Sequence, residues 1–247
     1  MEMKKIVISG ILLAGIFTAG CKVKTVPALP PEVYTYNGSA SGTAISVEFT
    51  KGKSFNHPLM AIWVEDEEGK FVQTLYVSES IGKGVFQHGD KSGGRWMPGE
   101  IRRPAALPYW SHRRGIKAGD GLFIPDKKSP VPDAYTGPTP AGSFVINTIV
   151  EKNDLRKFTV YFEINQTWDW NEYWTNNKYP DDEEYKTSCQ PALVYRADIN
   201  INGTQKEFPM KVIGHSHYSG KTGELFTDLS TITTAMQITG DLKVMIR

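Results

Sequence analysis

Short runs of β-forming residues, separated by turn residues, constrain the fold of this chain more than any other feature. Thr43–Thr50 alternates small or polar residues with apolar ones, and Leu59–Val77 holds two such runs around a turn at 66–70, as is typical of a β-hairpin. Further runs follow, with Gly203-Thr204 as a second hairpin turn between the third and fourth of them: 143–150, 158–164, 192–201, 208–213 and 242–246. Helical periodicity is scarce. We therefore expect an all-β fold, an immunoglobulin-like β-sandwich.

Residues 78–140 interrupt this pattern and predict a long irregular loop insertion. They contain glycine-rich turns and, within Ser129–Pro140, four prolines. Pro104 and Pro108 limit this region to a short helix at most, because proline removes a backbone donor and clashes with the preceding turn. One further helical turn is expected at Ser230–Ala235. An irregular stretch of this length is usually functional or has packing of its own.

The first 21 residues predict where the protein resides. Lys4 and Lys5 precede an apolar run from Ile6 to Phe17, and small residues then lead to Cys21. This order is typical of a secretory signal peptide. A cysteine after Ala-Gly resembles the bacterial lipobox, in which that cysteine is lipidated and becomes the mature N-terminus. The apolar run of about 12 residues is shorter than the ~20 that a bilayer-spanning helix needs, which disfavours an uncleaved anchor.

We expect residues 1–20 to be removed, and residues 21–42 to form a lipidated cysteine and a flexible tether ahead of one β-sandwich domain, 43–247. Lys22 follows the cysteine, which by resemblance to bacterial sorting rules favours the outer membrane, facing the periplasm. Cleavage removes two of the 28 basic and one of the 27 acidic side chains, which leaves 26 of each. This balance argues against a nucleic-acid partner and makes the lipid the expected contact with the membrane.

The residue types that most often carry catalysis are sparse here. Cys189 is the remaining cysteine of the mature chain and has no Cys-x-x-Cys partner, so a small packed side chain is favoured over a nucleophilic or redox thiol. Neither Ser111 nor Ser216 lies in a Gly-x-Ser-x-Gly nucleophile elbow. The acidic run 181–184 lacks EF-hand spacing and is expected to be a solvated loop. We therefore predict no catalytic residues, and a non-enzymatic role is favoured.

The segment Gly214–Gly220 contains two histidines, His215 and His217, just after a predicted strand. Residues two apart in extended backbone face the same way, so both imidazoles can converge on a divalent metal. Such a site needs a third ligand, and the candidates are His112, His57, Asp169 and Asp133. In the favoured alternative, the two histidines hydrogen-bond loops at the end of the sandwich.

The segment Gln166–Trp174 concentrates aromatic side chains beside polar ones. Exposed, they would stack on sugar rings or planar ligands; buried, they would cover one end of the sandwich, which is the commoner arrangement for aromatics at this density. The candidate ligand-binding residues lie in this segment and at other aromatic, imidazole and acidic positions: Trp168, Asp169, Trp170, Trp174, Trp110, His112 and Tyr218.

Two of these regions together resemble one protein family. His57–Asp66 (HPLMAIWVED), followed by Gly69–Leu75 (GKFVQTL), is similar to the first hairpin of the DUF2271 family of predicted periplasmic proteins. Asp133–Phe144 (DAYTGPTPAGSF) matches a second stretch of that family, and it is also similar to a turn in the immunoglobulin-like domain of flagellar hook-capping proteins. The resemblance implies a β-sandwich over roughly residues 43–247. Family members are often encoded near PepSY-type membrane proteins and flavin transferases, which implies a link to envelope redox or iron handling.

These observations favour a lipid-anchored, non-enzymatic module of the cell envelope that binds a small ligand or an envelope protein. Its expected surface combines 78–140, Trp168–Trp174 and Gly214–Gly220. The alternative is a metal-binding envelope protein, either a hydrolase or a metal- or redox-linked carrier, with His215 and His217 as ligands of a divalent metal.

Overall fold

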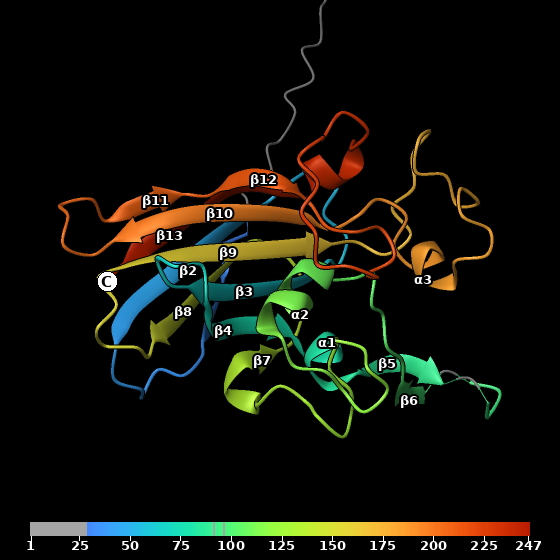
Figure 1. The fold of residues 1–247 in the computed structure, drawn as a ribbon, viewed down its shortest axis with the longest axis horizontal. Coiled ribbons are helices and arrows are strands. Elements are labelled where there is room, and N and C mark those ends of the chain that lie inside the picture. Colours follow the sequence, from blue (N-terminus) through green and yellow to red (C-terminus); the bar gives the residue numbers. More distant parts are fainter. Residues whose placement is uncertain (1–28, 91, 96) are drawn as a thin grey trace, which may run out of the picture.

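The computed structural model describes residues 29–247 except 91 and 96. The expected signal peptide, Cys21 with its expected lipidation, and the first part of the expected tether lie outside the described residues. Thirteen strands in three sheets, with only short helices, make up the described part of the chain and confirm the predicted all-β sandwich (Figure 1). No helix in this part is long and apolar enough to cross a membrane.

Two large sheets form the sandwich. One has five strands in the order β1 (Glu32–Thr35), β8 (Phe144–Val150), β2 (Thr43–Lys51), β13 (Thr239–Ile246) and β11 (Glu207–Pro209). The other has six strands in the order β12 (Lys211–His215), β10 (Leu193–Asn200), β9 (Lys157–Asn165), β3 (Leu59–Glu65), β4 (Phe71–Ser78) and β7 (Thr136–Gly137). A separate two-stranded sheet pairs β5 (Val85–Asp90) with β6 (Met97–Glu100).

The predicted turn at residues 66–70 joins β3 and β4, and Gly69 makes it possible. Its backbone has a φ of +74°, a left-handed conformation that glycine adopts without the clash of a Cβ. The Gly69 N–H donates to the Asp66 carbonyl at 3.0 Å, and the Lys70 N–H donates to the Asp66 carboxylate at 2.8 Å. Both bonds close the hairpin at the place that the sequence predicts.

Apolar side chains from the facing sides of the two sheets interlock in an inner core. Phe49 of β2 stacks on Phe144 of β8 with ring centroids 4.6 Å apart, and lies 5.9 Å from Phe162 of β9 in the opposite sheet. All three rings are buried. Aromatic pairs of this kind add roughly 0.5–1.5 kcal/mol each beyond the area that they bury.

The six-stranded sheet is covered on its other face as well. β3 is buried at all seven positions, and its Trp63 packs with Ala106, Leu107 and Trp110 in a second cluster, the outer core. The covering layer belongs to the expected loop insertion and includes α1 (Glu79–Lys83) and α2 (Pro108–Arg114), which lie against this sheet (Figure 1). Three shorter helical segments complete the described structure: η1 (Asp133–Tyr135), α3 (Glu183–Lys186) and η2 (Thr234–Gln237).

Two expectations about strands need correction. The sandwich begins within the expected tether, because β1 pairs in parallel with β8 from Glu32↔Phe144 to Thr35↔Asn147. The second predicted hairpin partner, 208–213, is two strands in different sheets: β11 pairs with β13, whereas β12 pairs with β10. The chain crosses between the sheets at Met210, whose N–H donates to the Leu242 carbonyl at 2.9 Å.

Helix α2 is attached to the six-stranded sheet through Glu163 of β9. This side chain is fully buried and points away from the inner core. Its two carboxylate oxygens accept the backbone N–H groups of Tyr109 at 3.1 Å and Trp110 at 2.7 Å. The first N–H groups of a helix have no partner within the helix, so a carboxylate from the sheet takes the place of a side-chain cap.

The last turn of α2 is held by a second carboxylate, that of Glu65 on the neighbouring strand β3. The Arg113 guanidinium donates to both oxygens of Glu65 at 2.6 Å, and the Trp63 indole donates to one of them at 3.0 Å. The Glu65 side chain is 1% exposed and that of Arg113 is 35% exposed. Bidentate geometry and a third donor satisfy a carboxylate that water cannot reach.

We predict that Arg113→Met lowers the free energy of unfolding by about 2–3 kcal/mol, because it leaves the Glu65 carboxylate buried with one remaining donor. Urea unfolding of the variant measures the loss. The matched control is Arg196→Met, which breaks the more exposed Arg196–Asp198 pair at 2.7 Å and is expected to cost less than about 1 kcal/mol. Equal losses in the two variants would contradict a structural role for the Glu65–Arg113 pair.

Candidate functional site

Several predicted site residues meet at one end of the sandwich. The segment after β9, which includes α3, and the segment after β12 both extend from the same end of the six-stranded sheet (Figure 1). Their aromatic side chains interlock: the Tyr218 ring stacks on Tyr179 at 4.1 Å between centroids and lies 6.1 Å from Trp174. Trp174 in turn lies 6.1 Å from the His215 imidazole. The sequence left open whether the aromatic segment is exposed or buried, and each description holds for a part of it.

Trp174 closes the end of the inner core, whereas its neighbours face outward. Its side chain is buried, and its indole N–H donates to the Thr231 hydroxyl at 3.1 Å. Trp168 is 64% exposed, Trp170 58% and Tyr173 51%. Three large aromatic side chains are thus displayed on one short segment, Gln166–Trp174, which we call the aromatic loop.

The aromatic loop is fixed by its own polar residues. The Asn171 carboxamide oxygen accepts the backbone N–H groups of Tyr173 at 2.9 Å and Trp174 at 2.7 Å, and its nitrogen donates to the Thr231 carbonyl at 2.9 Å. The Asp169 carboxyl accepts from the Thr234 hydroxyl, and burial raises the pKa of this carboxyl. Asp169 therefore helps to hold the loop in place, and its second carboxyl oxygen is buried with no hydrogen-bond partner in the described residues.

Two residues next to this loop have backbone conformations that L-amino acids rarely adopt. Trp168 has a φ of +58° and Cys189 a φ of +67°. The two segments pair as a short parallel bridge between Asp169 and Cys189, with the Gln190 N–H donating to the Asp169 carbonyl at 3.0 Å. Strain of roughly 1–3 kcal/mol at each such residue persists only where the surroundings impose it. The surroundings therefore fix the backbone at Trp168, from which the exposed indole projects.

Cys189 has the environment of a packed side chain. It is fully buried, and burial raises the pKa of its thiol to about 11. A thiol, not a thiolate, is therefore present at neutral pH, which makes the residue a poor nucleophile.

The acidic run at 181–184 is partly helical. Asp182 caps α3 by accepting the Tyr185 N–H at 3.1 Å, and its carboxylate pairs with Lys221 at 2.9 Å. This ion pair joins the α3 segment to the segment after β12.

The two histidines form hydrogen bonds with their own loop. The His215 Nδ1 donates to the Ser216 carbonyl at 2.8 Å, and its buried ring stacks on Phe226 at 5.4 Å. The His217 Nδ1 accepts the Ser219 N–H at 3.2 Å, so the proton of the neutral ring is on Nε2. A metal ion would have to displace this proton to bind at Nε2. Burial lowers the pKa of both imidazoles.

No group of three or more His, Cys, Asp or Glu side chains in the described part of the chain is arranged to hold a metal ion. Two of the four predicted third ligands bond to other groups: the Asp169 carboxyl accepts from the Thr234 hydroxyl, and the His112 Nδ1 donates to the Pro108 carbonyl at 2.8 Å. His112 packs on Phe123 and lines a separate cavity of about 350 Å³ together with Lys221.

Trp110 needs correction as a candidate ligand-binding residue. Its side chain is fully buried in the outer core, and its indole N–H donates to the Thr74 hydroxyl at 3.1 Å. A ligand cannot reach it in this structure, because α2 turns this ring toward the sheet. Its contribution is to the packing of α2.

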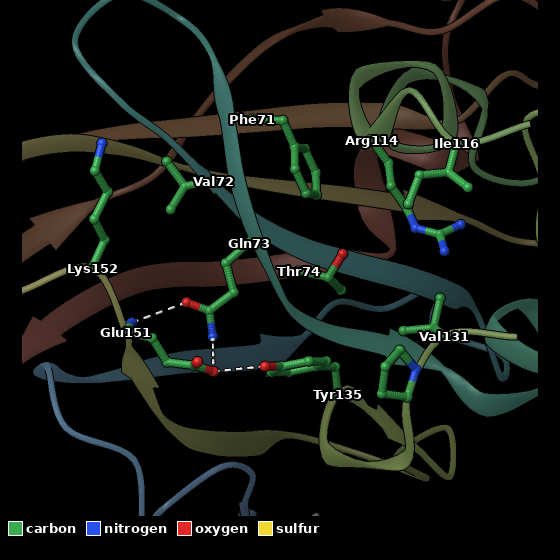
Figure 2. Close-up of a pocket in the computed structure, with 11 residues that line it drawn as sticks. Phe71, Val72, Gln73, Thr74, Arg114, Ile116, Val131, Tyr135, Glu151 and Lys152 are labelled. Atoms are coloured by element: carbon green, nitrogen blue, oxygen red, sulfur yellow. Dashed lines mark hydrogen bonds between the residues drawn. The ribbon is translucent and has the colours of Figure 1, made fainter.

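The sequence pattern gave no indication of a cavity that lies beside α2. Figure 2 shows Arg114 and Ile116 on one side of it and Glu151 and Lys152 on the other, with Phe71 and Val72 between them. Its volume is about 620 Å³, within the range of ~300–1,000 Å³ that is usual for small-molecule sites. The sequence shows two adjacent arginines, Arg113 and Arg114, at the end of α2. It does not show which of them forms an ion pair, because this depends on the position of Glu65 in the fold.

No protein-family model, curated protein or solved structure matches this chain. The resemblance to the DUF2271 family rests on the motifs at 57–75 and 133–144 and stays a prediction.

The buried carboxyl group of Glu163 gives the free energy of unfolding an expected pH dependence. Burial raises the pKa of its carboxyl from 4.5 to about 8, against the lowering effect of donors from Trp110, Tyr109 and Ser216. The folded protein therefore keeps this proton between about pH 4.5 and 8, where the unfolded chain has lost it. Stability from this group is complete below pH 4.5 and is lost as the pH rises to about 8.

We predict that Glu163→Gln, which stays neutral, gains stability relative to the wild-type protein as the pH rises through this window. The Gln amide fits the two N–H donors less well, and this penalty is constant with pH. Urea unfolding at several pH values measures the difference, with exposed Glu172→Gln as the control that leaves it flat. A variant that loses stability relative to wild type with rising pH would show that the helix keeps Glu163 ionised.

Proposed function

We propose that the protein is a lipid-anchored, non-enzymatic binding module of the bacterial cell envelope, attached through Cys21 to the outer membrane and facing the periplasm. The supporting features are the basic, apolar and small-residue order of the first 21 residues and the absence of Asp after the cysteine. Ten residues separate Cys21 from Glu32, where β1 begins. Even fully extended, this connection spans roughly 35–40 Å, which would keep the sandwich close to the membrane.

The aromatic loop is the proposed contact surface. Exposure of Trp168, Trp170 and Tyr173 on a loop that is hydrogen-bonded from within is the observation that carries this proposal. Rigid aromatic side chains lose little conformational entropy on binding and supply a large contact area, which is why they dominate many interfaces.

Polar groups beside the rings would orient a ligand. The Lys178 ammonium lies 3.1 Å from the centroid of the Tyr173 ring and donates to the Tyr173 carbonyl at 3.0 Å. Glu172 is exposed between Trp170 and Tyr173. Sugar rings and planar ligands suit this combination, because they stack on aromatic faces while their hydroxyl or amide groups bond to charged neighbours.

The anchoring part of the proposal predicts that Cys21→Ala abolishes attachment to the membrane. Metabolic labelling with an alkyne fatty acid should mark the wild-type protein and not the variant. After cell fractionation, the wild-type protein should be in the outer-membrane fraction. Labelling of the Cys21→Ala variant, or an inner-membrane location of the wild-type protein, would contradict the proposed anchor.

The binding part of the proposal predicts that Trp168→Ala with Trp170→Ala weakens binding to purified peptidoglycan sacculi, as a glycan probe, by at least about tenfold. Co-sedimentation measures binding, and Leu122→Ala, which removes an exposed apolar side chain outside the loop, is the matched control. A triple variant adds His217→Ala to the two tryptophan changes. If the double and the triple variant both bind sacculi as tightly as the wild-type protein and cause no defect of the cell envelope, the surface is assigned wrongly.

A further inference from the structure

The cavity beside α2 contains an arginine without a partner. The Arg114 guanidinium forms no ion pair and no hydrogen bond with any residue of the described chain, although it is partly buried. The Arg114 guanidinium carbon lies 5.8 Å from the centroid of the Trp110 ring. Arg113, the residue before it, is fully engaged with Glu65 and Gly69.

This arrangement leaves a positive charge that is partly buried and has no partner in the described residues. Burial is the cause that lowers the pKa of Arg114, and no neighbouring carboxylate offsets it. A partly desolvated guanidinium without an acceptor is unfavourable, and an anion with two oxygens satisfies its planar set of donors.

The walls next to Arg114 are largely apolar. Phe71 and Val72 come from β4, Ile116 follows α2, and Val131 and Pro132 come from the segment before η1. Ile116 is 51% exposed and adds accessible apolar surface beside the guanidinium. The cavity thus combines one free cation with an apolar lining.

The opposite side of the cavity is polar but already satisfied. Gln73 donates to the Glu151 carboxylate at 3.0 Å and accepts the Glu151 N–H at 3.0 Å, and the Tyr135 hydroxyl donates to the same carboxylate at 2.6 Å (Figure 2). Lys152 lies loosely beside Asp66, at 3.9 Å. These bonds fix the shape of the cavity and leave Arg114 as the group in need of a counter-charge.

We propose that this cavity binds a small organic anion, whose carboxylate or sulfonate pairs with Arg114 and whose apolar body packs against Phe71, Val72, Ile116 and Val131. This site is separate from the aromatic loop and does not depend on the proposed function. A second negative charge is disfavoured, because the Glu151 carboxylate stands on the far side of the cavity.

The test compares two fluorescent probes with nearly the same aromatic body: 8-anilinonaphthalene-1-sulfonate, which is anionic, and N-phenyl-1-naphthylamine, which is neutral. Both hydrophobic cores are formed within 29–247, so the chain from Lys22 onward is used without lipid or detergent. Trp168→Ala and Trp170→Ala are present throughout to remove probe binding at the aromatic loop.

In this background, Arg114→Gln is expected to weaken binding of the anionic probe by about ten- to a hundredfold, the effect of losing a charged hydrogen-bond partner, with little change for the neutral probe. Arg156→Gln is the charge-matched control, because Arg156 is exposed and does not line the cavity. Ile116→Glu, at a half-exposed position, should also weaken the anionic probe by supplying a carboxylate to Arg114. Circular dichroism and thermal unfolding verify that each variant is folded.

Equal affinity of Arg114→Gln and Arg156→Gln for the anionic probe would overturn the proposal, as would equal losses for both probes. Displacement of the anionic probe by octanoate or by 2-naphthoate supports it, and the stronger competitor shows whether an acyl or an aryl body fits. Failure of both acids to displace the probe would also overturn it.

Discussion

The carboxylates of Glu65 and Glu163 determine where helix α2 lies, and much of the molecule depends on that position. Each carboxylate comes from a central strand of the six-stranded sheet and is turned away from the inner core. One accepts the first N–H groups of α2, and the other binds the arginine of its last turn. A buried carboxylate without donors is costly, so the sheet and the helix specify each other. A seven-residue helix that is marginal alone becomes part of a second core.

One of the two candidate binding regions, the cavity beside α2, follows from this placement. Arg113 turns toward Glu65, and the next residue, Arg114, is left to face the cavity beside β4. At the other end of α2, the Glu163 carboxyl group that caps the helix also lies close to Ser216. This serine belongs to the same loop as the two histidines. The aromatic loop is attached separately, by Asn171 and Asp169 to the segment around η2. The molecule therefore carries two distinct surfaces with different chemistry.

Much of the fold could be predicted from the sequence, because strand formation follows local alternation and turn residues. The segments at 43–50, 143–150, 158–164 and 242–246 all lie in strands. Pairing partners are a property of the whole chain, and the hairpin predicted for 208–213 holds only in part: β12 pairs antiparallel with β10, whereas β11 joins the other sheet. β1 was missed because four residues with no apolar run become a strand only by pairing with the edge of β8. The sequence singled out the aromatic loop as a candidate, but only exposure in the structure separates Trp168 and Trp170 from the buried Trp174 and Trp110.

The sequence by itself determined the all-β class and the hairpin at Gly69, since each of these depends on residues close together in the chain; an address in the envelope stays a prediction. Tertiary structure decided which charges are paired and which aromatic rings are free. Glu65 and Arg113 are 48 residues apart, and nothing local indicates that their pairing leaves Arg114 without a counter-ion. Burial and ion pairing depend on what a side chain meets across the fold, and for this reason the cavity beside α2 could be found only in three dimensions.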